Sequence, residues 1–283
     1  MRNYAGIEDK FSEYEFASTL LQSIPYDGTS TWGKGADIGF AAFLEASENM
    51  EVYDIETDSE VYQTGIHILP EIDENSSPKA VYDIVKRTTE ELLKSEKFLT
   101  FFGGEHAISI GVIDAFRNKY KDLTILQLDA HADLRRSYMD SEYNHACALH
   151  RASQHTNLIQ VGIRSMDSSE KEFMNTEKCF FAHEIMNNVD WMEDSLALMT
   201  ENIYLTIDLD VLDPSIMPAT GTPEPGGLDW YTTMEYLRKV FASRNIVGFD
   251  IVEFAPIAAL SAPAFLVAKM YYKLLSYKFS YEK

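Results

Sequence analysis

Short apolar runs alternate along this chain with longer amphipathic segments, and this alternation narrows the folds that the chain can adopt. The apolar runs have the length of buried strands and cover residues 98–102, 123–128, 158–163, 203–207 and 246–251. The amphipathic segments have helical spacing and cover residues 79–96, 107–119, 230–242 and 263–275. Strands that alternate with helices of this length are typical of βαβ units, so we predict an α/β fold with a mostly parallel central sheet.

The distribution of glycine and proline favours a single domain. The 14 glycines and 9 prolines are scattered, and the sequence has no linker-like tract, no low-complexity segment and no repeat with a period of 20–50 residues. Because α/β folds reach roughly 250 residues as one unit, residues 1–283 are expected to form one domain.

Carboxylate and imidazole side chains gather directly after two of the predicted strands. Asp129, His131 and Asp133 alternate with two alanines after the strand at 123–128, and Asp208 and Asp210 follow the strand at 203–207 in the same pattern. Alternate residues of an extended chain share one face, so each group is expected to point one way. Sites in parallel sheets lie beyond the carboxyl ends of the strands, where the two groups would meet.

A third strand end adds His106, which follows Gly103 and Gly104 after residues 98–102. The glycines allow a close backbone approach there. The combined set has four carboxylates and two imidazoles, and two divalent cations would neutralise it. Carboxylate-rich sites with some imidazole favour Mn²⁺, although ligand type alone also allows Fe, Co or Zn. A metal pair lowers the pKa of a shared water, which indicates metal-assisted hydrolysis.

Two further residues are candidates for chemistry beside these ions. His145 lies after a polar loop at 138–144 and could shuttle protons, since the ordinary pKa of histidine is about 6.5. Glu253 lies just past the strand at 246–251 and could accept two hydrogen bonds from a guanidinium group. Each also has a purely structural interpretation, His145 as a surface histidine and Glu253 as a turn residue. The aspartates could likewise be turn or helix-capping residues.

Composition excludes several classes of partner. The chain has 24 basic and 45 acidic residues and a formal net charge of −21, which argues against nucleic acid and anionic membranes. No stretch approaches the roughly 18 apolar residues of a membrane span, and the N-terminus lacks the pattern of a signal peptide. Cys147 and Cys179 are too few for a disulfide framework. A cytoplasmic location is therefore expected.

These motifs together resemble the ureohydrolase superfamily, the arginases and agmatinases, over roughly residues 18–275. The first strand and its loop are matched to residues 24–28 and 35–37. The other matching segments are residues 103–106, 129–133, 208–214, 218–223 and 250–253. The resemblance implies a three-layer α/β/α fold with one mostly parallel sheet. It also implies a homo-oligomer, a trimer or a hexamer.

The resemblance also implies a ligand set and a set of roles. Two Mn²⁺ ions per subunit would be held by His106, Asp129, His131, Asp133, Asp208 and Asp210. A hydroxide that bridges the ions would attack the guanidinium carbon of a small cationic guanidine, with Asp133 hydrogen-bonded to the hydroxide. His145 would deliver a proton to the departing amine, Glu253 would orient the guanidinium, and Thr222 would add a hydrogen bond.

The substrate implied by the resemblance is agmatine, which would be cleaved to putrescine and urea. The segments at 133–135, 144–146 and 222–227 are similar to those of bacterial agmatinases, and the groups with which arginases hold a carboxylate are absent. Arg135 and Arg136 leave 4-guanidinobutyrate open, and arginine is a further alternative. Asp167 and Glu170 could hold the ammonium end of agmatine or simply start a helix. A catalytically inactive metal-binding regulatory protein is the alternative that is not an enzyme.

Overall fold

The computed structural model describes residues 2–281, and its centre is one eight-stranded sheet in which all neighbouring strands run parallel. The strands follow the spatial order β2-β1-β3-β8-β7-β4-β5-β6. Their bounds are β1 (Thr19–Ile24), β2 (Ile66–Ile68), β3 (Phe98–Gly103), β4 (Leu123–Leu128), β5 (Asn157–Val161), β6 (Cys179–Phe180), β7 (Asn202–Asp208) and β8 (Asn245–Val252).

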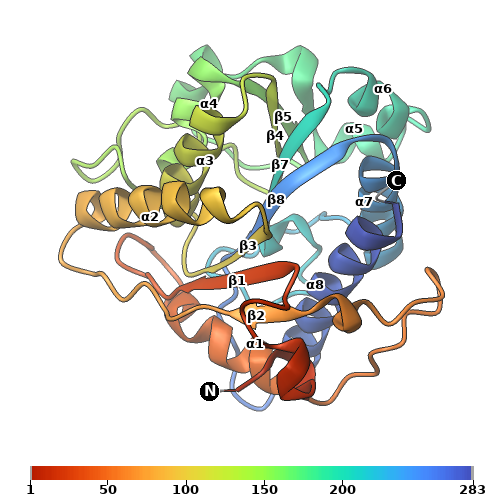
Figure 1. Ribbon diagram of the computed structural model, residues 1–283. Coiled ribbons are helices and arrows are strands. Elements are labelled where there is room, and N and C mark those ends of the chain that lie inside the picture. Colours follow the sequence, from red (N-terminus) through yellow and green to blue (C-terminus); the bar gives the residue numbers. More distant parts are fainter. Residues whose placement is uncertain (1, 282–283) are drawn as a thin grey trace.

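Helices cover both faces of this sheet (Figure 1). The α-helices are α1 (Gly39–Ser47), α2 (Pro78–Leu92), α3 (Ile108–Lys119), α4 (His150–His155), α5 (Ala182–Ile185), α6 (Trp191–Ala197), α7 (Trp230–Ser243) and α8 (Ala262–Tyr281). Short 3₁₀ turns are η1 (Tyr4–Gly6), η2 (Asp9–Phe11), η3 (Ala36–Ile38), η4 (Val61–Thr64), η5 (Leu93–Ser95), η6 (His145–Cys147), η7 (Ser168–Glu172), η8 (Thr176–Lys178) and η9 (Leu209–Val211).

Two apolar cores flank the sheet. One contains buried residues of α2, α3 and α4, and the other contains those of α1, α6, α7 and α8. Neighbouring strand residues feed opposite cores, since Phe102 stacks on Phe43 of α1 while Phe101 meets Phe116 of α3 edge-on. The strands are buried on both faces, as central parallel strands are, and therefore appear as continuous apolar runs. The predicted three-layer α/β/α fold is confirmed.

The five predicted strands and four predicted helices all form; the strand at 123–128 has the predicted bounds and the others have shifted ends. The strand expected at 158–163 ends at Val161, because Gly162 turns the chain at φ +93°. The helix expected at 79–96 becomes the 3₁₀ turn η5 after Leu92, and Glu96 then takes a left-handed φ of +59°. The last helix continues past residue 275 to Tyr281, and Ser276 and Tyr277 are still buried.

Several elements have too weak a signal for the sequence to predict them. Strands β2 and β6 have only three and two residues, and α4 and α5 only six and four. Strand β1 precedes the segment 24–28 that was matched to the first strand, and only Ile24 belongs to both. No helix within residues 2–281 has the length and hydropathy needed to cross a membrane.

The sheet order brings four chain segments to one place. Strands β3, β8, β7 and β4 are consecutive neighbours, so the segments that follow them leave the same edge side by side. Gly104 lets the segment after β3 approach the loop after β1, because a β-carbon on Gly104 would lie 2.0 Å from the carbonyl oxygen of Tyr26. The close approach expected at the glycine pair is therefore present.

Candidate metal centre and active site

The predicted ligands lie at the carboxyl ends of three of these four central strands, β3, β4 and β7. His106 follows β3, Asp129 follows β4, and Asp208 is the last residue of β7. The Nδ1 atom of His106 lies 3.1 Å from Asp129 Oδ2 and 3.5 Å from Asp208 Oδ2, and it also lies 3.1 Å from Asp133 Oδ2. All four side chains are buried. One imidazole nitrogen thus faces three carboxylates.

Thr206 holds the Nε2 atom of His106 on the side of the ring that faces away from the carboxylates. The hydroxyl of Thr206 donates its proton to Asp250 Oδ1 at 2.6 Å, so it accepts the hydrogen bond from His106 Nε2 at 2.9 Å. Tyr204 donates a second hydrogen bond to Asp250. Nδ1 of His106 has no hydrogen-bond partner although it is buried, and in the neutral ring it carries the lone pair. Burial opposes the charged form of His106, but the facing carboxylates of Asp129, Asp133 and Asp208 outweigh this and raise its pKa. A lone pair turned toward carboxylate oxygens fits a bound cation, and histidine ligands are commonly held through their other nitrogen in this way.

A second group lies next to the first. His131 Nδ1 lies 2.8 Å from Asp210 Oδ2 and 3.8 Å from Asp129 Oδ1. Single ligand atoms of Asp129, His131 and Asp210 lie within 4.8 Å of one another, as do those of His106, Asp129 and Asp208. Asp129 belongs to both groups. The donor set of carboxylates and imidazoles therefore fits two adjacent divalent cations.

Burial and neighbouring charges shift the pKa values of the clustered side chains. Burial and the neighbouring carboxylates of Asp210 and Asp133 raise the pKa of Asp129 to about 7. Burial and Asp210 also raise the pKa of Asp208. Burial opposes the charged form of His131, but the carboxylate of Asp210 outweighs this and raises the pKa of His131 to about 11. Like charges in a dry site favour neutralisation, by protons or by cations.

The ligands share one cavity without following the regular alternation that the sequence indicated. Asp133 reaches the cavity through a left-handed φ of +52°, so the segment after β4 is not extended throughout. Asp210 lies in η9. The backbone nitrogen of Asp210 donates a hydrogen bond to Asp208 Oδ1 at 2.9 Å. The capping interpretation of Asp208 is thus correct. The other carboxylate oxygen, Oδ2, faces His106, so the same residue can cap η9 and serve as a ligand.

Donors from the surrounding chain also hold the ligand carboxylates. Gln127 donates to Asp129 Oδ2 at 2.7 Å, and the backbone nitrogen of Ala130 donates to Asp210 Oδ1 at 2.9 Å. The sequence analysis assigned no function to Gln127, Thr206 or Asp250, although Asp250 belongs to the matched segment 250–253. Their signal was a polar residue within an otherwise apolar strand, which needs a buried partner.

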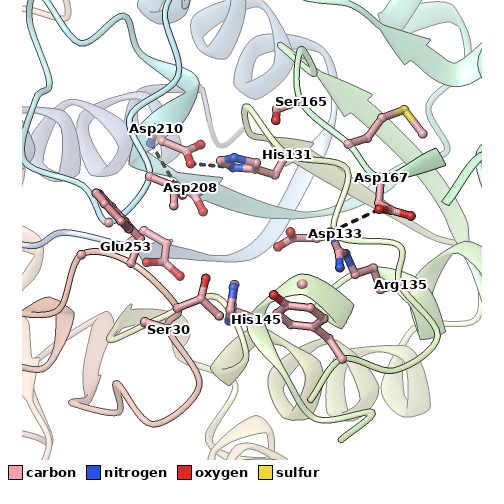
Figure 2. A pocket seen from close by; sticks show the side chains of 18 of the residues that line it. Ser30, His131, Asp133, Arg135, His145, Ser165, Asp167, Asp208, Asp210 and Glu253 are labelled. Carbon is pink, nitrogen blue, oxygen red and sulfur yellow. Dashed lines mark hydrogen bonds and ion pairs between the residues drawn. The ribbon is translucent and has the colours of Figure 1, made fainter. Parts of the chain in front are cut away.

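A cavity of about 290 Å³ opens above the cluster (Figure 2). His131, Asp208 and Asp210 lie along one wall, with Glu253 beside them and His145 opposite. Thr222 also lines this cavity. All nine predicted site residues therefore lie at one place. Seven line the cavity, His106 contacts Asp133 and Asp208 of its lining, and Asp129 contacts His131. Their roles remain predictions.

Glu253 and His145 are fixed by contacts with other loops. Glu253 follows β8 with a left-handed φ of +64°, and its Oε1 accepts a hydrogen bond from the backbone nitrogen of His106 at 2.7 Å. Burial and the nearby Glu105 carboxylate raise the pKa of Glu253. Burial lowers the pKa of His145, although Asp133 opposes this. A cationic ligand in the cavity would favour the ionised form of Glu253.

The far end of the cavity contains the acids whose role the sequence left open. Glu170 has a structural role, because its two carboxylate oxygens accept hydrogen bonds from the backbone nitrogens of Leu134 and Asp167. Asp167 caps η7 through Oδ1, and its Oδ2 lies 3.8 Å from Arg135. Arg135 also stacks over the ring of Tyr138. The helix-start interpretation is correct for both acids, but Asp167 keeps one oxygen on the cavity side.

Comparison with known proteins identifies relatives along nearly the whole chain. The arginase family model matches residues 17–276. The N(1)-aminopropylagmatine ureohydrolase of Synechocystis is 34% identical over an alignment of 280 positions that covers 95% of this chain and 92% of the relative. The agmatinase of Bacillus subtilis is 30% identical over 87% of this chain and 86% of the relative.

The fold agrees with solved structures of the same kind. The agmatine ureohydrolase of Thermoplasma volcanium superposes with a TM-score of 0.86 and 29% identity, covering 96% of this chain and 94% of the other. The predicted resemblance is confirmed at the level of the family. Arginase-family enzymes depend on a pair of metal ions, and the two ligand groups described above match that requirement. The chain belongs to the arginase family and is a ureohydrolase.

Proposed function

We propose that this ureohydrolase cleaves agmatine to putrescine and urea with two Mn²⁺ ions. The observation that carries the proposal is the buried Nδ1 of His106, which has no hydrogen-bond partner and faces three buried carboxylates beneath a cavity lined by Glu253 and His145. The cluster accounts for a metal pair, and the cavity above it accounts for a small cationic substrate. The net charge of −21 adds long-range attraction for a dication.

In this proposal the ligands form two sets, and Asp129 and Asp208 belong to both. One ion would be held by His106, Asp129, Asp133 and Asp208, and the other by His131, Asp129, Asp208 and Asp210. When bound, the ions supply Lewis acidity and lower the pKa of water.

The remaining residues handle the guanidinium and the protons. Hydrolysis adds one water to the guanidinium carbon and breaks its bond to the substituted nitrogen, which leaves as the amine. Glu253 orients the guanidinium through its carboxylate, which favours planar N–H pairs. Asp133 accepts a hydrogen bond from the nucleophile. His145 protonates the departing nitrogen, which would otherwise leave as an amide anion. Thr222, on the cavity wall, donates a further hydrogen bond.

The far end of the cavity would hold the tail of the substrate beyond its guanidinium group. Asp167 presents one carboxylate oxygen to the cavity, where it would attract the terminal ammonium of agmatine. A second candidate substrate is N(1)-aminopropylagmatine, because the Synechocystis relative is named for it. Arg135 at the same end keeps a substrate with an acidic tail, such as 4-guanidinobutyrate, as a third.

Urea release from four guanidines would establish the substrate. We expect the Mn²⁺-loaded protein to release urea mainly from agmatine. A cationic tail suits Asp167, and the motifs after Asp133 and before His145 lack the residues with which arginases hold a carboxylate. N(1)-aminopropylagmatine, arginine and 4-guanidinobutyrate are measured alongside, each before and after chelation. A preference for another guanidine would overturn agmatine while keeping the chemistry. No urea from any of them with metal bound would favour an inactive metal-binding protein.

Charge substitutions at the far end test how the tail is held. Asp167→Asn keeps the capping oxygen but loses the charge, and we expect it to raise the KM for agmatine about two- to fivefold, the usual range for a partly exposed ion pair. Arg135→Gln should lower that KM and raise the KM for 4-guanidinobutyrate. Steady-state kinetics of both variants on both substrates measure this. Equal KM changes on the two substrates would contradict the proposed tail site.

Thermal unfolding with and without Mn²⁺ tests the cluster. Binding at 100 times the dissociation constant adds about 2.7 kcal/mol to the free energy of unfolding, so Mn²⁺ should raise the Tm of the natural chain. We expect Asp208→Asn to lose most of this rise because it removes a ligand that faces His106. Asp213→Asn is the matched control, since the Asp213 carboxylate accepts hydrogen bonds from Ser215 and Gly226 instead. Equal Mn²⁺-induced rises in both variants would contradict the ligand assignment.

A further inference from the structure

A buried carboxylate beside the metal cluster serves neither as a predicted ligand nor as a substrate contact. Glu105 has no exposed surface. Its Oε2 accepts hydrogen bonds from the backbone nitrogens of Thr29 at 2.8 Å and Ser30 at 2.7 Å, and from the Ser30 hydroxyl at 3.0 Å. Its Oε1 accepts one from the Thr29 hydroxyl. Four donors from one loop therefore converge on a single carboxylate.

The Thr29 hydroxyl connects this carboxylate to His145. A threonine hydroxyl has one proton to donate and two lone pairs to accept with. Its proton goes to Glu105, so the contacts to His145 are accepted ones, from the backbone nitrogen at 3.0 Å and from Nδ1 at 3.1 Å. Nδ1 of His145 must then carry a proton. Nε2 is the nitrogen left for the cavity, into which the ring points in Figure 2.

We propose that Glu105 and Thr29 are positioning residues that fix the ring orientation and the tautomer of His145 so that Nε2 faces the substrate. This inference rests on the proposed role of His145 as proton donor. A proton donor must deliver from the nitrogen nearest the reacting atom, and an imidazole free to flip would present either one. The negative charge of Glu105 polarises the Thr29 hydroxyl and so strengthens it as an acceptor for Nδ1–H.

Thr29 is the better site for a test than Glu105. Glu105 is the sequence neighbour of the predicted ligand His106, and its charge raises the pKa of Glu253. Its replacement would therefore disturb the metal ligands and the proposed guanidinium contact together. Thr29→Val removes only the hydroxyl at nearly constant shape. Thr29→Ser keeps the hydroxyl and loses only a methyl group. The pair separates the hydrogen bond from the packing of this loop.

Steady-state kinetics on the Mn²⁺-loaded variants give the first readout. We expect Thr29→Val to lower kcat about 10- to 100-fold, part of what a positioned proton donor contributes, with KM within about threefold. Thr29→Ser should restore most of kcat. Metal content is measured on each variant. An unchanged kcat in Thr29→Val, or an equal fall in both variants at full metal content, would overturn the proposal.

Nuclear magnetic resonance of ¹⁵N-histidine-labelled protein gives a readout that does not depend on activity. With a diamagnetic divalent ion bound, we expect the neutral His145 of the natural chain to carry its proton on Nδ1. Thr29→Val should shift the population toward the Nε2–H form, and Thr29→Ser should not. A proton on Nε2 in the natural chain would overturn the proposal even if Thr29→Val fails to fold. A natural chain that releases no urea but has the Nδ1–H form would overturn the proposed function and leave the positioning intact.

Discussion

Mutual repulsion among four buried carboxylates is the constraint on which the rest of this structure depends. Asp129, Asp133, Asp208 and Asp210 meet at the carboxyl ends of β4 and β7, where little water screens them. Such a cluster is costly unless hydrogen-bond donors and cations compensate its charges. Gln127 and the backbone nitrogens supply the donors. Thr206 holds Nε2 of His106, so that Nδ1 is the nitrogen turned toward the carboxylates.

Much of this arrangement could be predicted because it follows from periodicity and from strand ends. The runs at 123–128 and 203–207 are apolar since both faces of the sheet are covered, and the polar residues begin where that cover ends. The family resemblance joined the clusters into one ligand set. Nothing in a single sequence gives the sheet order, however, and it is this order that makes β3, β8, β7 and β4 neighbours.

What the sequence could not predict depends on tertiary contacts with no local signal. The left-handed backbone at Asp133 and Glu253 runs against the preference of residues that carry a side chain, and the surrounding loops impose it. Glu170 resembles a ligand for a substrate ammonium, yet two backbone nitrogens claim its carboxylate. Glu105 was part of a matched motif, but its contact with Thr29 spans 76 residues of chain. Polar residues of this kind acquire a role only when the fold supplies their partners.

Anomalous X-ray diffraction at the manganese absorption edge, from crystals grown with Mn²⁺, tests the central claim most directly. We predict two peaks per chain, one next to Nδ1 of His106 and one next to Nδ1 of His131, with Asp129 and Asp208 between them. A single peak, or peaks away from both imidazoles, would contradict a metal pair held by these carboxylates.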